Sequence, residues 1–270
     1  MSPTSLEERI AEIGAVGRRL AEIESTEGAA GNLSILVGFG LPVPDEFDAA
    51  EPFVPPVILP DLEGAQILAT ASGRRLREVA GDPYANLVLV EIGAKGETGT
   101  VRYAAGKGPL RPTSEINTHL ALHARCQCPE SGFHAVVHAQ PLHLTFLTHI
   151  PRYQDEMEFN RRLLRWQPET IFQMPEGLGV LPFLIPGSEE LMRRTVEKME
   201  SCQMVVWGKH GVVARSRKSL RHAADLIEYA ETSARYEHMN LVAGEPAEGL
   251  TNDEMRWIAT TFDLKQRFFA

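Results

Sequence analysis

The sequence has few of the features that carry a chain out of the cytoplasm or into a membrane. No stretch approaches the roughly 18 uninterrupted apolar residues of a membrane-spanning helix. The segment from Met1 to Glu8 contains acidic residues and no basic region ahead of an apolar one, unlike a secretory signal. The three cysteines, Cys126, Cys128 and Cys202, give an odd count and no disulfide framework. We therefore expect a cytoplasmic protein in a reducing compartment.

Positive charge is also scarce. Lys and Arg number 27 against 36 Asp and Glu, which gives a net charge of −9 and a pI near 5.5. A general nucleic-acid or anionic-membrane partner is not expected, because counterion release requires a cationic surface. The 270 residues are 43% apolar and 23% charged, which is typical of a globular protein. We expect one α/β domain over residues 1–270.

The first half of the chain begins with a helical pattern and continues with extended ones. Ser5-Leu6-Glu7-Glu8 is a capping box, and apolar residues then recur at helical spacing up to Ile23. Apolar runs bounded by turn residues predict strands over 32–37, 87–92 and 100–103, the last two as a hairpin. The proline-rich, acidic stretch Pro42–Pro60 predicts an ordered surface loop with little regular structure.

The second half alternates helices and strands. Apolar spacing predicts a helix over 115–126, and two more helices begin after Ser188 and Ser219. Short apolar runs predict strands over 135–138 and 204–207. This order is typical of an α/β fold in which helices cover both faces of a mixed sheet.

An anion site is one interpretation of Thr113-Ser114-Glu115, which follows Pro112 at the start of a predicted helix. Free backbone N–H groups and the helix dipole favour negative charge at such a position. Ser and Glu are also ordinary capping residues, so a simple helix cap is the alternative.

Two histidines follow buried strands and are candidate metal ligands. His138 ends one strand, and Gln140, two residues later, points to the same face of an extended chain, with His143 shortly beyond. His210 lies in Lys209-His210-Gly211 after another strand. Imidazoles placed in this way can bind a transition metal, preferably zinc, whereas a hydrogen-bonded structural role is the alternative for each.

A second histidine pair carries no metal signature. His119 and His123 lie four residues apart on a predicted helix, but no zinc-protease motif surrounds them. We interpret both as structural or solvent-facing.

Taken together, these segments resemble the class II aldolase and adducin-like superfamily, and within it the rhamnulose-1-phosphate aldolases. The resemblance covers nearly the whole chain except Pro42–Pro60. An ordered set of motifs carries it: Gly31-Asn32-Leu33-Ser34, Ser72-Gly73-Arg74, Asp82–Leu87, Pro112–Glu115, His138, Gly177–Pro182, Ile185–Gly187, Trp207–Gly211 and the segment Glu254–Phe268. It implies an α/β/α sandwich around a mixed, largely antiparallel sheet.

The resemblance also implies a set of site residues. A zinc ion is implied between His138, the residue at position 140 and His210, with Glu115 nearby for proton transfer. Residues with short side chains or free backbone donors are implied to hold the substrate phosphate or the dihydroxyacetone end: Gly31, Asn32, Ser72, Gly73, Thr113 and Ser114. Glu169 matches an acid that reaches the site of a neighbouring subunit, which implies a homotetramer with shared sites. By periodicity alone, Glu169 would be a surface glutamate.

The chemistry of the family explains these residue types. Cleavage of a C–C bond beside a carbonyl leaves a carbanion, which a divalent metal chelated by the carbonyl and hydroxyl oxygens can delocalise. Two carboxylates in different surroundings can then take one proton and return another. We assign Glu115 to the carbon and Glu169 to the aldehyde oxygen.

The sequence departs from the family pattern at two positions. Gln140 stands where the His-x-His motif has its second histidine, and a neutral amide oxygen should weaken zinc binding and favour oxygen-preferring metals. His143 is a candidate substitute ligand. Ala29 stands where the family has a polar Asn near the substrate.

Three functions therefore remain open. The first is an aldolase that cleaves L-rhamnulose 1-phosphate, or a close ketose 1-phosphate, to dihydroxyacetone phosphate and an aldehyde such as lactaldehyde. The second is a sugar-phosphate 4-epimerase that does not release the fragments. The third is an adducin-like binding or regulatory module without tight metal binding, so metal content and product analysis distinguish the three.

Overall fold

The computed structural model describes residues 5–126 and 133–269, so Cys128 lies outside the described residues. Nine strands form one sheet in the order β2-β5-β4-β3-β1-β6-β9-β8-β7. Their bounds are β1 Asn32–Phe39, β2 Ala49–Phe53, β3 Ala65–Thr70, β4 Leu87–Ile92, β5 Gly99–Tyr103, β6 His134–Ala139, β7 Gly179–Leu181, β8 Met204–Trp207 and β9 Gly211–Ser216. All neighbouring strands are antiparallel except β7 and β8. The mixed, largely antiparallel sheet of the prediction is confirmed.

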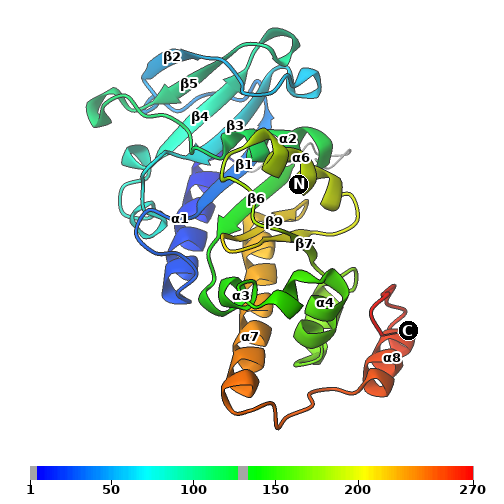
Figure 1. Ribbon diagram of the computed structural model, residues 1–270. Coiled ribbons are helices and arrows are strands. Elements are labelled where there is room, and N and C mark those ends of the chain that lie inside the picture. The colour runs from blue at the N-terminus through cyan, green and yellow to red at the C-terminus, as the bar shows by residue number, and fades with distance from the viewer. Residues whose placement is uncertain (1–4, 127–132, 270) are drawn as a thin grey trace.

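Helices cover both faces of this sheet, as the sequence predicts for an α/β/α sandwich (Figure 1). One core cluster joins the sheet to α1, α3, α4, α5, α7 and α8, and two others join the opposite face to α2 and α6. The bounds are α1 Leu6–Glu22, α2 Ile116–Cys126, α3 Leu142–Leu147, α4 Glu156–Leu164, α5 Pro168–Gln173, α6 Glu189–Lys198, α7 Leu220–Val242 and α8 Asn252–Thr261. None of the described helices is long and apolar enough to cross a membrane.

Local capping explains why the predicted helices begin where they do. Ser5 forms the complete capping box of α1 with Glu8, and the hydroxyls of Ser188 and Ser219 accept from the N–H three residues later at the starts of α6 and α7. In α1 the apolar positions identified by their spacing face the core, and α7 likewise buries the apolar residues of one face. Figure 1 shows the two helices side by side, and Arg19 of α1 forms an ion pair with Glu228 of α7.

The expectation of little regular structure over Pro42–Pro60 is wrong for part of the stretch. Residues 49–53 form β2, an edge strand that pairs antiparallel with β5, and Tyr103 donates a hydrogen bond to Glu51 at 2.8 Å. Pro52 is tolerated because an edge strand leaves one side of its backbone unpaired. A search for alternating apolar residues misses such a strand, because the strand contains an acidic residue and proline.

The alternation of strands β1 and β6 decides which side chains meet α2. Leu33, Ile35 and Val137 belong to the core cluster beneath α1 and α7. Their neighbours therefore point to the opposite face, toward α2. The register pairs Asn32 with His138, so the end of β6 lies beside the start of β1. The candidate site is built at this point of the sheet.

Candidate metal centre

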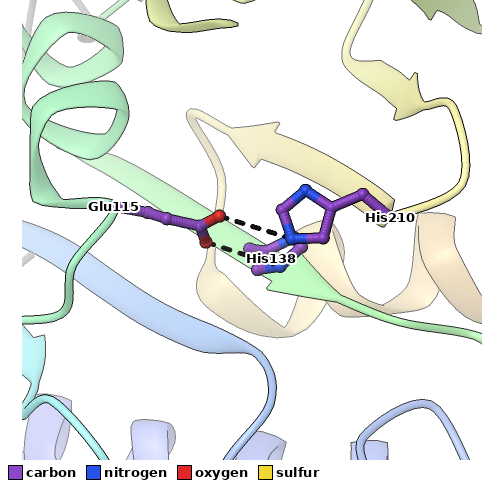
Figure 2. Close-up of side chains that lie close together, drawn as sticks. All are labelled: Glu115, His138 and His210. Carbon is purple, nitrogen blue, oxygen red and sulfur yellow. Dashed lines mark ion pairs between the residues drawn. The ribbon is translucent and has the colours of Figure 1, made fainter. Parts of the chain in front are cut away.

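Three elements bring one carboxylate and two imidazoles together (Figure 2). Glu115 immediately precedes α2, His138 lies near the end of β6, and His210 lies in the turn between β8 and β9. Nε2 of His138 is 3.4 Å from Oε2 of Glu115, and Nε2 of His210 is 3.5 Å from Oε1. One potential ligand atom from each residue lies within 4.8 Å of the others. The three side chains therefore converge on one point.

The tautomer of His138 suits a metal ligand. Its Nδ1 lies 2.9 Å from the carbonyl oxygen of Val212, which can only accept, so Nδ1 carries the proton. Nε2 is then the ring nitrogen that faces Glu115 and can bind a metal. Hydrogen bonding of the second ring nitrogen to a carbonyl is the usual way in which proteins orient a histidine ligand.

His210 is held by its loop and by an aromatic neighbour. Its ring stacks on Trp207 with a centroid distance of 5.2 Å, and the preceding Lys209 adopts a left-handed φ of 60°. The backbone N–H of Lys209 donates to Thr148 at 2.7 Å, which fixes the turn. Burial, together with nearby His138, lowers the pKa of His210 to about 4, although Glu115 opposes this effect. The imidazole is therefore neutral near pH 7, the form that can bind a metal.

Opposing effects act on the carboxyl group of Glu115, which is 5% exposed. Burial alone would raise its pKa, because desolvation penalises the charged form. The proximity of His138 and a 2.9 Å hydrogen bond from Nδ2 of Asn32 outweigh burial, so its pKa lies below the ordinary value. The group is ionised at neutral pH.

These residues line a hollow of about 190 Å³ at the N-terminal end of α2. The predicted substrate-binding residues line the same hollow: Gly31, Asn32, Ser72, Gly73, Thr113 and Ser114. Gly73 has a φ of 71°, which favours glycine, and Ser72 and Ser114 are exposed. The helix dipole favours an anion at the start of α2, so this part of the hollow suits a phosphate.

Close packing of β9 against β6 requires a glycine beside the imidazoles. A Cβ atom on Gly211 would lie 2.5 Å from the carbonyl oxygen of Ala139 and 3.1 Å from Cε1 of His138. Any other residue there would push β9 away from β6. The Lys209-His210-Gly211 motif thus combines a ligand with the space that the ligand needs.

The structure brings most, but not all, of the remaining predicted residues to the hollow. Gln140 lines it, just beyond the end of β6, and so does Ala29. His143, at the start of α3, is not among the described residues that line it, and its Nδ1 lies 2.6 Å from Oε1 of Glu231 on α7. Glu169 is exposed on α5 and does not line the hollow of its own chain either.

Two further observations concern residues outside that set. His119 and His123 are fully buried, so the solvent-facing alternative is wrong, because α2 packs this face against the sheet. Arg74 lines the hollow, and no role was assigned to it from the sequence. In the sequence, only its position directly after Ser72-Gly73 indicates a role at the site.

The donor set fits a divalent cation. Two imidazoles and a carboxylate are common ligands of zinc and of other transition metals. The buried Nδ1 of His210 has no hydrogen-bond partner among the described residues, which leaves its Nε2 as the ring nitrogen directed at Glu115. His138 and His210 would hold the ion, with Glu115 or Gln140 beside it.

A family model described as the class II aldolase and adducin N-terminal domain matches residues 11–238. The chain belongs to this family. The rhamnulose-1-phosphate aldolase of Listeria monocytogenes serotype 4a is 28% identical over 206 residues, which cover 76% of this chain and 74% of that enzyme. The rhamnulose-1-phosphate aldolase of Yersinia pseudotuberculosis serotype O:1b is similar to the same extent.

Solved structures agree with the class II aldolase fold. A sugar-phosphate aldolase from Thermotoga maritima has a TM-score of 0.75 at 30% identity, covering 90% of this chain and 98% of that one. An L-fuculose 1-phosphate aldolase has a TM-score of 0.62 at 21% identity, covering 97% and 100%. The second likeness is one of fold alone.

Proposed function

We propose that the protein is a metal-dependent class II aldolase that cleaves L-rhamnulose 1-phosphate, or a close ketose 1-phosphate, to dihydroxyacetone phosphate and an aldehyde such as lactaldehyde. The observation that carries the proposal is the convergence of Glu115, His138 and His210 in a polar hollow of a class II aldolase family member. The rhamnulose-1-phosphate aldolases among its relatives motivate the choice of sugar.

His138 and His210 are the proposed metal ligands, with Gln140 as a third, weaker one. When bound, a divalent cation, which we propose to be Zn²⁺, stabilises the negative charge that develops on the ketose carbonyl oxygen during C–C cleavage. The protein keeps His210 neutral and orients the ring of His138, so that little reorganisation is needed when the substrate arrives.

The phosphate has a proposed place at the other end of the hollow. Ser72, Gly73 and Ser114 offer hydroxyl and backbone donors, and the N-terminus of α2 favours negative charge. Arg74 adds a cation to the same lining. A phosphate held here leaves the ketose carbonyl directed toward the imidazoles.

Two proton movements balance the reaction. The hydroxyl on C4 loses its proton as the C3–C4 bond breaks and becomes the aldehyde, and C3 gains a proton to give dihydroxyacetone phosphate. We assign Glu115 to C3, because its carboxyl group is buried beside both imidazoles. Its protonated form returns the proton to C3 in cleavage, and its ionised form takes that proton in the reverse condensation. Proton exchange with water, from Glu169 and to Glu115, resets both groups between turnovers. We assign Glu169 of a neighbouring subunit to the aldehyde oxygen, in a homotetramer with shared sites.

Product analysis tests this proposal. Protein loaded with Zn²⁺, Co²⁺ or Mn²⁺ is incubated with L-rhamnulose 1-phosphate and with L-fuculose 1-phosphate, and dihydroxyacetone phosphate is assayed. Release of this product from either sugar supports the aldolase, and a higher kcat/KM for rhamnulose 1-phosphate supports the substrate. Conversion to an epimeric sugar phosphate without fragments would instead identify a 4-epimerase. A protein that binds none of the metals would be a binding module.

A further inference from the structure

A row of buried polar side chains runs from the hollow into the core between the sheet and α2, and the proposed reaction gives most of them no role. From the hollow inward, the row consists of Glu115, Asn32, His119, Ser34, His123 and His134. None of these residues is more than 7% exposed. Burying so many polar groups is costly unless each finds a partner, so their arrangement calls for an explanation.

Strand and helix periodicity bring the row together. Asn32 and Ser34 lie two apart on β1 and face α2, while His119 and His123 lie four apart on α2 and face β1. His134 lies on the neighbouring strand β6. The hydrogen bonds measure 2.5 Å from His119 to Asn32, 2.6 and 2.7 Å from His119 and His123 to Ser34, and 3.0 Å between His123 and His134.

The carboxylate sets the direction of the first two bonds. An ionised carboxylate only accepts, so Asn32 donates through Nδ2 to Glu115, at 2.9 Å. This orientation turns Oδ1 of Asn32 toward His119. Because Oδ1 also only accepts, His119 carries its proton on Nε2.

The same reasoning fixes the remaining bonds. A neutral imidazole has a single N–H, so Nδ1 of His119 accepts from the hydroxyl of Ser34. The Ser34 oxygen then accepts from Nε2 of His123, whose Nδ1 accepts from Nδ1 of His134. Every donor in the row therefore points toward Glu115.

The imidazoles have the charge state that this pattern requires. Burial lowers the pKa of His119 and of His134 to about 3, and it lowers the pKa of His123 well below its ordinary value. All three rings are neutral near pH 7. A positive charge on His119 or His123 would place a second N–H where the pattern needs an acceptor.

The row is unsuited to carrying protons. At its far end Nε2 of His134 is buried and has no hydrogen-bond partner among the described residues, so the row has no described exit to solvent. Near the hollow Asn32 interrupts it, because an amide does not readily pass on a proton. A role in orientation remains.

We propose that Asn32, His119, Ser34, His123 and His134 form a one-way hydrogen-bond chain that positions the Glu115 carboxylate for proton transfer. The inference rests on the proposed function, since it is in that reaction that Glu115 moves a proton. Asn32 occupies a lone pair of Oε2, which leaves Oε1, on the side of His210, as the better oxygen to hold the proton. His119 is thus a positioning residue that acts through Asn32.

Two amide substitutions at His119 form a matched pair. In His119→Gln the side-chain amide reaches the position of Nε2 and can still donate to Asn32, whereas in His119→Asn it reaches only the position of Nδ1, beside Ser34. We expect His119→Asn to lower kcat about 10- to 100-fold, with KM changed less than about three-fold, because misplaced catalytic groups have costs of this size. His119→Gln should retain most of kcat.

Circular dichroism and thermal melting of both metal-loaded variants check that each is folded. Wild-type kcat in folded His119→Asn would overturn the proposal, and so would equal losses in the two variants, which would mean that ring packing rather than the link to Asn32 matters. If the wild-type protein cleaves neither sugar phosphate, the proposed function fails, and the test below still decides the hydrogen-bond chain.

Imidazole ¹⁵N NMR of the wild-type protein reports which ring nitrogens in the hydrogen-bond chain carry a proton, and it needs no substrate. At pH 7 we expect protonated Nε2 on His119 and His123 and protonated Nδ1 on His134, assigned from the signals lost in single His→Gln variants. A protonated Nδ1 on His119, or a charged ring at His119 or His123, would rule out the one-way chain. This measurement also decides whether the one-way hydrogen-bond chain exists if the His119 variants do not fold.

Discussion

At the scale of single residues, Glu115 combines burial with an ionised carboxylate beside two imidazoles, a combination that is typical of functional sites. We predict that Glu115→Gln lowers turnover by about two to four orders of magnitude, the usual loss for an acid–base group. The amide keeps the volume and a hydrogen bond with Asn32, so folding and phosphate binding should be nearly unchanged. Steady-state kinetics with the exposed Glu97→Gln as control measures the effect, and turnover within a few-fold of wild type would rule the role out.

Gln140 is the residue that departs most from the family motif. Because it lines the hollow beside His138, Gln140→His should complete a three-imidazole site. One additional protein ligand worth about 1.4 kcal/mol tightens binding about ten-fold, so we predict at least this gain in zinc affinity. Isothermal titration with zinc measures it. Unchanged affinity in a folded variant would remove position 140 from the metal centre.

His143→Ala is the matched control for that experiment. The His143 ring is bonded to Glu231 and does not line the hollow, so zinc affinity should stay at the wild-type value. A marked loss would mean that His143 turns inward and replaces the missing ligand.

Local sequence pattern identified the candidate ligands one at a time, and only the family resemblance implied that they meet. His138 and His210 were identified because each follows a buried strand. Their approach depends on the order β6-β9-β8, which is set by pairings between distant segments. The structural role of His119 and His123 was foreseen as one of two alternatives, but their bonds to Ser34 depend on α2 packing against β1, which local pattern does not encode.

At the scale of elements, α2 carries two buried neutral imidazoles against the sheet, and β6 supplies a third. The pKa of His119 and of His134 is about 3 in the folded protein, against about 6.5 in an unfolded chain. The unfolded state therefore binds more protons between these values. Stability should be fully present above pH 6.5 or so and fall as the pH decreases toward 3, by at most about 1.4 kcal/mol per pH unit for each such ring.

Urea unfolding between pH 7.5 and 5 measures this slope, because most carboxylates remain ionised over that range. His134→Asn supplies the comparison, since an amide at the Nδ1 position can still donate to His123 but does not titrate. Its stability should depend less steeply on pH than that of the wild type. Equal slopes would show that His134 is protonated in the folded state or exposed to solvent.

Elements with local signals were predicted well, and those defined by pairing were not. The caps of α1, α6 and α7 lie within three residues of the helix starts, so the sequence contains them directly. β2 has no such signal, because its partner β5 lies about fifty residues away and its own five residues include Glu51 and Pro52 and no alternating apolar pattern. Edge strands of this kind can be identified only from their pairing with the neighbouring strand in the structure.

At the scale of the whole molecule, the hollow of one chain contains Glu115 but not Glu169, which is exposed on α5. If Glu169 serves a neighbouring subunit, then Glu169→Gln and His138→Ala inactivate different parts of each shared site. Each variant alone should be nearly inactive. In a mixed homo-oligomer, a site is intact when a Glu169→Gln subunit contributes the imidazoles and a His138→Ala neighbour contributes the carboxylate.

Random one-to-one mixing makes roughly one site in four intact, because two independent choices must both be favourable in a closed ring of subunits. Co-refolded mixtures should therefore recover about a quarter of wild-type kcat per site. Mixing His138→Ala with His210→Ala is the matched control, since both lesions affect the same subunit's share of the site and no combination repairs it. Recovery of activity in the first mixture but not in the second would establish that each site is shared between two subunits. If mixed oligomers form, as judged by differently tagged subunits, and neither mixture recovers activity, Glu169 does not act across an interface.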